Sequence, residues 1–101
     1  MIDDPDYSRI FTKARIIAWQ NGYALCVHGS ATRDLDLLAV PWTDEAKDPE
    51  DLVVHVADVC DLVPSPAKPS VRPHNRKTWT LLFKEFGDPR WVDLSIICPT
   101  N

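Results

Sequence analysis

The sequence lacks any apolar run long enough to cross a membrane. A spanning helix requires roughly 18 to 20 consecutive apolar residues, and no segment of this chain approaches that length. The amino terminus carries the acidic residues Asp3 and Asp4, unlike the basic start of a secretory signal. We therefore expect a cytoplasmic protein that has no membrane partner.

Cysteine and histidine are scarce, with three residues of each. The cysteines are odd in number and widely spaced, which excludes a disulfide framework and any paired-cysteine metal motif. Each cysteine lies in an apolar stretch, so we expect three buried thiols. No two histidines have the spacing of zinc ligands, so a zinc site is not expected. The residues concerned are Cys26, Cys60, Cys98, His28, His55 and His74.

Basic residues are fewer than acidic ones, and the formal net charge is -4. This balance argues against duplex nucleic acid as the main partner, because binding its phosphates depends on several Lys and Arg contacts. The charges are also unevenly distributed. Residues 34–61 hold nine acidic side chains and a single Lys or Arg, at Lys47. Residues 68–77 hold four basic side chains and no acidic one: Lys68, Arg72, Arg76 and Lys77.

The composition that remains is typical of one folded domain. Hydrophobic residues make up 45% of the chain and charged residues 26%, far from the core-poor composition of disordered proteins. A chain of 101 residues has room for one hydrophobic core. Residues 1–101 are therefore expected to form a single domain.

Hydrophobic periodicity predicts two helices and four strands. The first helix begins at Asp4-Pro5, an N-cap followed by proline, and ends at Asn21-Gly22. The second begins at Asp48-Pro49, and its apolar stripe runs on to Val63, before Pro64. Short apolar or alternating segments predict the four strands. Their ranges are 23–28, 35–40, 77–86 and 90–98.

The order of these elements predicts an α/β (α+β) fold. Helix, strand, strand, helix, strand and strand fit a small mixed sheet with both helices packed on one face. The last two strands form a β-hairpin around Gly87-Asp88-Pro89. The proline-rich segment 64–75 is expected to be a loop without regular structure.

Three aspartates are the candidates for catalysis and metal binding. Asp34 and Asp36 are two residues apart on a predicted strand, so their carboxylates share one face. Asp93 stands in the middle of an apolar strand, where an unpaired carboxylate is costly and requires a partner or a metal. Three carboxylates on neighbouring strands suit Mg²⁺ or Mn²⁺ in phosphoryl transfer. Alternatively, Asp34 and Asp36 form a polar hairpin end, with Asp34 paired to Arg33.

The segments around these aspartates resemble the polymerase-β-type nucleotidyltransferase superfamily. The resemblance comprises an apolar strand ending in Gly-Ser (25–30), an Asp-x-Asp strand (33–38) and a third Asp on a later strand (91–95). The chain is similar in size to minimal stand-alone members, including small proteins of phages and mobile elements. The resemblance implies an enzyme that transfers a nucleoside monophosphate from a triphosphate to a hydroxyl, with Mg²⁺ or Mn²⁺ as cofactor.

Six residues are expected to bind the nucleotide. Members of that superfamily place a turn of helix between Gly-Ser and the first Asp, and its amino end receives the phosphates. Only three residues stand there in this chain, so Ser30, Thr32 and Arg33 would donate hydrogen bonds to the phosphates instead. The basic loop 68–77 is either a solvated loop or binds the triphosphate through its arginines, with Trp79 or Trp91 stacking on the nucleobase. The six are Gly29, Ser30, Thr32, Arg33, Arg72 and Arg76.

Two alternatives remain open at this stage. The shortened segment between Gly29-Ser30 and Asp34 also fits a catalytically inactive module of the same fold. Such a module would bind a protein partner, as a phage accessory or antitoxin-like protein does. The other alternative is an unrelated small α/β protein in which the three aspartates coincide by chance.

Overall fold

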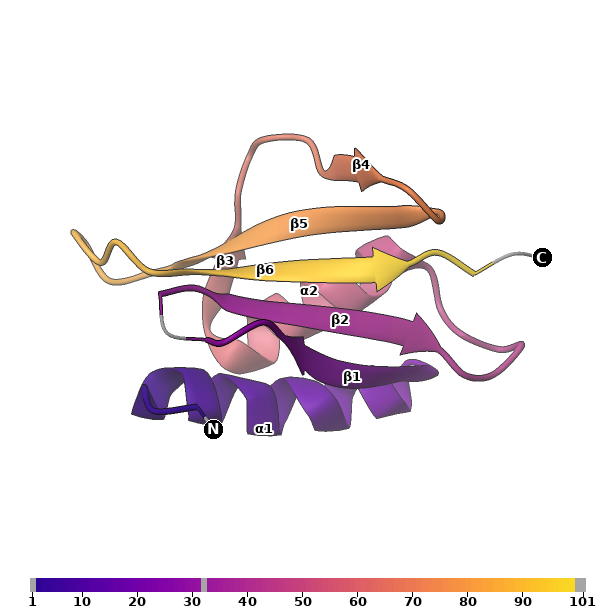
Figure 1. Cartoon of the computed structure of the whole chain (residues 1–101), viewed down its shortest axis with the longest axis horizontal. Coiled ribbons are helices and arrows are strands. Elements are labelled where there is room, and N and C mark those ends of the chain that lie inside the picture. Colours follow the sequence, from indigo (N-terminus) through magenta and orange to yellow (C-terminus); the bar gives the residue numbers. More distant parts are fainter. Residues whose placement is uncertain (1, 32, 100–101) are drawn as a thin grey trace.

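The computed structural model describes residues 2–31 and 33–99, and in this part of the chain it contains two helices and six strands (Figure 1). The predicted order of two helices and four main strands is confirmed, and two short strands are added before β5. In chain order the elements are α1 (Pro5–Gln20), β1 (Tyr23–His28), β2 (Leu35–Pro41), α2 (Pro49–Cys60), β3 (Leu62–Pro64), β4 (Ser70–Arg72), β5 (Arg76–Phe83) and β6 (Trp91–Ile97).

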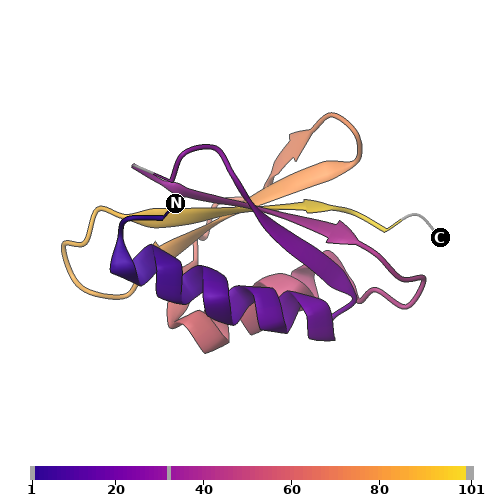
Figure 2. The same ribbon diagram turned by 60° about the horizontal axis from the view of Figure 1, so that its bottom comes forward.

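All six strands belong to one mixed sheet. Its order is β1-β2-β6-β5-β3, and β4 pairs with another part of β5. Strands β2 and β6 run parallel, whereas the other pairs are antiparallel. Both helices lie beneath the same face of the sheet, which confirms the predicted layers (Figure 2). The opposite face, here called the open face, is covered by no helix of the described residues.

The hydrophobic core lies between the two helices and the sheet. Alternate residues of the central strands point into it, as the period of two along a strand requires. On β2 and β6 the buried residues flank the two aspartates directly, which fixes both carboxyl groups on the open face. These core residues are Leu35, Leu37, Val92, Leu94 and Ile96.

Both ends of α1 follow from local chemistry. The Asp4 carboxylate accepts hydrogen bonds from the backbone N–H of Asp6 at 2.9 Å and of Tyr7 at 3.4 Å. Beyond the helix, Gly22 has φ +88°, and a Cβ added there would lie 2.7 Å from Cα of Ala46. Glycine is therefore needed both for the left-handed turn and for the close approach. Neither α1 nor α2 has the length and apolarity to cross a membrane.

The predicted end of the second helix is wrong. Helix α2 ends at Cys60, and Asp61 adopts a left-handed conformation with φ 59°. The chain then pairs with β5, so that Leu62 is buried while Val63 is 43% exposed on the open face. The apolar stripe therefore combines residues of a helix and of a strand, which helical spacing alone does not separate.

The segment 64–75 is not the irregular loop that its prolines predict. Pro64 closes β3, and β4 pairs with β5 as a short hairpin. His74 and Asn75 form the turn of this hairpin with φ 65° and 58°. Edge strands tolerate proline, and His and Asn accept positive φ more readily than most residues, so the sequence permits this hairpin.

The expectation of three buried thiols is also wrong. Cys60 is buried, Cys98 is half-buried and Cys26 is exposed. On β1 the buried residues are Tyr23 and Leu25, so alternation places Cys26 on the open face. An apolar stretch in a strand of this sheet therefore does not bury every one of its residues.

Candidate functional site

Four polar residues form a row across the centre of the open face. Strand pairing places His28 opposite Asp36, Asp36 opposite Asp93, and Asp93 opposite Thr80. Residues paired directly across strands project from the same face of a sheet. The four side chains therefore lie side by side on β1, β2, β6 and β5.

Asp36 and Asp93 are the two carboxyl groups in the middle of this row. Partial burial raises the pKa of Asp36, and so do the negative charge of Asp93 and the hydrogen bond between the two carboxyl groups. The charge of Asp34 raises this pKa further, whereas the nearby His28 lowers it. Asp36 therefore retains a proton more readily than an ordinary aspartate.

Asp93 has the hydrogen-bond partners that a mid-strand carboxylate requires. The hydroxyl of Thr80 donates to Oδ1 at 3.0 Å, and the indole N–H of Trp91 donates to Oδ2 at 3.2 Å. The nearest base in sequence, Arg90, instead binds Asp4, Asp6 and Asp88. Two neutral donors on the open face therefore hold Asp93 in place.

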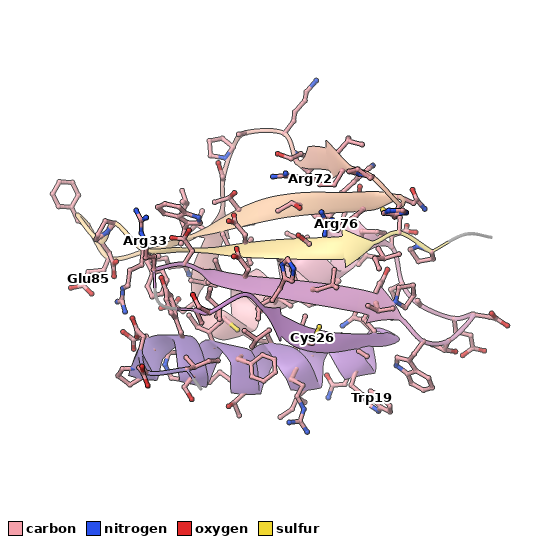
Figure 3. The ribbon with its side chains drawn as sticks, in the orientation of Figure 1. Trp19, Cys26, Arg33, Arg72, Arg76 and Glu85 are labelled. Carbon is pink, nitrogen blue, oxygen red and sulfur yellow. The ribbon has the colours of Figure 1, made fainter. Side chains whose placement is uncertain are left out.

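A small polar hollow of about 170 Å³ lies beside the two aspartates. Arg72 from β4 and Arg76 from β5 line it together with the aspartates, and Figure 3 shows the two arginines near each other over β5. The hollow thus combines two acids with two bases. Its remaining lining residues are His28, Thr78 and Ser95, of which the last two share a hydrogen bond of 2.8 Å between their hydroxyl groups.

Other residues predicted to form the site lie around the hollow rather than in its lining. Gly29 turns the chain with φ +82°, and a Cβ added there would lie 3.8 Å from Oδ2 of Asp36. Asp34 immediately precedes β2 and acts on Asp36 through its charge. Ser30 is exposed in the loop between β1 and β2. Gly29 and Asp34 therefore remain neighbours of Asp36 without lining the hollow.

Arg33 lies apart from the other two predicted arginines. Figure 3 shows it near the opposite end of the sheet from Arg76. Its side chain is exposed, and its carbonyl oxygen accepts a hydrogen bond of 2.9 Å from the Tyr7 hydroxyl. Arg33 and Arg76 are therefore separated along the sheet. Thr32, the remaining predicted nucleotide-binding residue, lies outside the described residues.

The carboxylates do not form a preassembled metal centre. Among residues 2–31 and 33–99, no group of three or more His, Cys, Asp or Glu side chains is placed to hold a metal ion together. Asp36 and Asp93 nevertheless offer adjacent oxygen donors of the kind that Mg²⁺ and Mn²⁺ prefer. Their repulsion, which raises the pKa of Asp36, is what a divalent cation would relieve. The donor set therefore fits such a cation.

Sequence reasoning assigned no role to three hydroxyl residues of the open face. Thr78, Thr80 and Ser95 bind each other or Asp93 there. Alternation along β5 opposite the buried Leu81 could have indicated both threonines. Of the two tryptophans expected to stack on a base, Trp91 lies on the open face. Trp79 packs against the core, because it is paired with the buried Leu94, so it cannot serve the site.

The chain matches no family model, and it matches no curated protein or solved structure. A function for the chain therefore rests on its own residues. Those residues bring a carboxyl pair and two guanidinium groups to one hollow on an uncovered sheet face.

Proposed function

We propose that this chain is a metal-dependent nucleotidyltransferase that moves a nucleoside monophosphate from a triphosphate to a hydroxyl acceptor. One observation carries the proposal: Asp36 and Asp93 are paired on neighbouring parallel strands and share a hollow with Arg72 and Arg76. Acids for a cation and guanidinium groups for phosphate oxygens are the two requirements of phosphoryl transfer by charge stabilisation. The resemblance of residues 25–30, 33–38 and 91–95 to nucleotidyltransferase motifs supports the same reaction.

In the proposed reaction, the oxygen of the acceptor hydroxyl forms a bond to the α-phosphorus. The bond between this phosphorus and its bridging oxygen breaks, and pyrophosphate leaves with the electron pair. The proton of the hydroxyl passes to a carboxylate oxygen of the Asp36–Asp93 pair. The two carboxyl groups line the hollow together, so the proton acceptor and the phosphate-binding arginines share one site.

A bound Mg²⁺ or Mn²⁺ would be held by Asp36 and Asp93, with Asp34 the next carboxylate along the chain, and would neutralise phosphate charge. The protein supplies the remaining positive charge through Arg72 and Arg76. Thr80 and Trp91 keep Asp93 oriented towards the hollow through their hydrogen bonds.

Thermal unfolding with each nucleoside triphosphate and Mg²⁺ or Mn²⁺ tests this function. A ligand that binds only the folded state raises the midpoint, so wild type should be stabilised by at least one triphosphate with metal. Asp93→Asn should abolish this rise, whereas Asp44→Asn, which removes the same charge from an exposed turn, should retain it. The proposal fails if no triphosphate stabilises wild type, or if Asp93→Asn responds as wild type does.

Thermal unfolding tests whether the site binds a nucleotide, and a second assay tests whether the nucleotide is transferred. Wild type is incubated with a triphosphate labelled at the α-phosphate, with metal and with candidate acceptors that carry a hydroxyl. Transfer releases pyrophosphate and moves the label to the acceptor, and Asp93→Asn should do neither. If the nucleotide binds but every acceptor remains unlabelled, the second candidate below is favoured.

The second candidate is an inactive module of this fold that binds a protein partner. An exposed aromatic pair favours it: Trp19 and Trp42 stack with ring centroids 4.4 Å apart and are 59% and 52% exposed. Exposed aromatic residues are enriched at protein interfaces. Under this candidate, Trp19→Ser would weaken partner binding while nucleotides leave the midpoint of wild type unchanged.

A further inference from the structure

A second hollow adjoins the polar one on the open face. It measures about 400 Å³ and is lined by Arg76 together with four residues that contribute mostly apolar surface: Leu38, Pro73, His74 and Ile97. Its volume is within the range of small-molecule sites, which is roughly 300 to 1,000 Å³. Leu38 and Ile97 are apolar although they face away from the core. The adjoining positions of the same face hold the polar residues Ser95 and Thr78.

Arg76 joins the two hollows, since it lines both. Its Nε atom is buried and has no hydrogen-bond partner among the described residues. A buried donor without a partner is costly, and a guanidinium group is suited to bind a phosphate oxygen. Arg76 therefore lies at the junction of the two hollows with one donor that no described residue satisfies.

The distance between the hollows also suits one ligand. Asp93 lines the polar hollow and Ile97 the apolar one, four residues further along β6. At about 3.3 Å per residue this is roughly 13 Å, enough for a sugar and a phosphate chain between a ring and a carboxylate-bound cation. The β4–β5 turn brings Pro73 and the imidazole of His74 to the apolar end.

From this juxtaposition we infer that the apolar hollow is the nucleobase subsite of the triphosphate, with Ile97 and Leu38 beneath the base and His74 and Pro73 beside it. The inference rests on the proposed function, because it assigns the phosphates of the same ligand to the polar hollow. Arg76 then binds the phosphate chain at the junction. The opposite end of the open face, at Trp91, is left for the acceptor.

The test compares two probes by titration calorimetry: nucleoside triphosphates and inorganic triphosphate, each with Mg²⁺. Inorganic triphosphate has the phosphate chain of the ligand but neither its sugar nor its base. The best nucleoside triphosphate should bind wild type about tenfold more tightly or better, since stacking a base on protein side chains contributes that much. Ile97→Thr and His74→Asn should each remove most of this advantage and leave the affinity for inorganic triphosphate unchanged.

The two variants and one control keep the fold. Threonine retains the strand preference of isoleucine, and asparagine accepts the positive φ of position 74. The control is Leu82→Thr, which also replaces an apolar residue of the open face by threonine, but on the side of Asp93 away from the apolar hollow. It should still bind the nucleoside triphosphate about tenfold more tightly than inorganic triphosphate. Circular dichroism of each variant confirms folding before titration.

The outcomes separate this inference from the proposed function. If inorganic triphosphate binds wild type as tightly as every nucleoside triphosphate does, the subsite is overturned while the phosphate site stands. If Ile97→Thr lowers both affinities equally, or Leu82→Thr lowers the nucleoside triphosphate affinity as much as Ile97→Thr does, the subsite is also overturned. If neither probe binds, the proposed function fails, and the subsite fails with it.

Discussion

Asp36 and Asp93 are paired with each other on the parallel strands β2 and β6, and their carboxyl groups line the same hollow on the open face. Two like charges at this separation cannot both ionise without cost. The two carboxyl groups lie at the centre of the sheet, where uncharged residues would lower the free energy of unfolding less.

Replacing Asp36 by Asn should stabilise the protein at pH 7. Partial burial and the charge of Asp93 raise the pKa of Asp36 above the 3.8 of a free aspartate, so folding favours its protonated form. Protonated Asp36 therefore contributes to the free energy of unfolding. This contribution is present below pH 3.8 and is lost as the pH rises through the higher pKa of Asp36 in the folded state. Asparagine has nearly the size of aspartate and places no charge beside Asp93. We expect a gain of about 0.2 to 1 kcal/mol at pH 7.

Urea unfolding at pH 3.5 and pH 7 checks this expectation, with metal removed by chelator. The gain should be larger at pH 7 than at pH 3.5, because the raised pKa leaves Asp36 of wild type mostly protonated at the lower pH. Asp44→Asn, in an exposed turn, serves as the charge-matched control. A loss of stability at both pH values would show that the Asp36 carboxyl is a structural hydrogen-bond donor.

Metal alone should stabilise wild type through the same carboxylates. Mn²⁺ at 100 times its dissociation constant would raise the free energy of unfolding by about 2.7 kcal/mol. Asp36→Asn and Asp93→Asn should each lose this response, and the response of Asp34→Asn shows whether the third carboxylate contributes a ligand. The midpoint is measured without nucleotide. An equal Mn²⁺ response in Asp93→Asn would place the metal elsewhere.

Removing the two guanidinium groups should weaken triphosphate binding. Arg72→Ala with Arg76→Ala is expected to cost about 1 to 3 kcal/mol, the range for hydrogen bonds to charged groups, and the remaining affinity should depend less on salt. Titration of nucleotide with Mg²⁺ at two ionic strengths measures both effects. Lys68→Ala removes an exposed base outside the hollow and is the matched control. Equal affinities of wild type and the double variant at both salts would exclude a phosphate-binding role.

We predict that Arg90 stabilises the fold and takes no part in the proposed reaction. Its guanidinium binds Asp4, Asp6 and Asp88 and lies 4.3 Å from the ring centre of Phe83, tying the start of α1 to the turn before β6. Arg90→Leu should lower the free energy of unfolding at pH 7 by about 1 to 3 kcal/mol. Nucleotide affinity of the folded variant should not change.

The pH dependence of this anchor has the opposite sign to that of Asp36. Burial raises the pKa of Asp4, but the hydrogen bonds from Arg90 and from the backbone of Asp6 and Tyr7 outweigh it, so the pKa is lowered overall. The stabilisation is therefore present above pH 3.8 and is lost as the pH falls through the lower pKa of the folded state. Urea unfolding across this range should show the difference between wild type and Arg90→Leu decreasing in acid. A constant difference would show that Arg90 acts through packing on Phe83 alone.

The sequence by itself determined which face the residues of β2 and β6 take. Alternation around Leu35, Leu37, Val92 and Leu94 predicted correctly that Asp36 and Asp93 project away from the core. The caps at Asp4-Pro5 and Asn21-Gly22 likewise marked both ends of the first helix. These features depend on residues a few positions apart, and such local patterns are directly visible in the chain. The metal, the nucleotide and the cytoplasmic location remain predictions.

The turn at Gly87-Asp88-Pro89 predicted the pairing of β5 with β6, but the tertiary structure alone decided the other strand neighbours. Parallel pairing of β2 with β6 brought Asp36 to Asp93, and pairing of β4 with β5 brought Arg72 to the hollow while Arg33 remained at the far end of the sheet. Pairing of β3 with β5 took Leu62 out of the predicted helix. Strand partners are chosen by the burial of whole faces and by backbone hydrogen bonds between distant segments, so no local pattern specifies them.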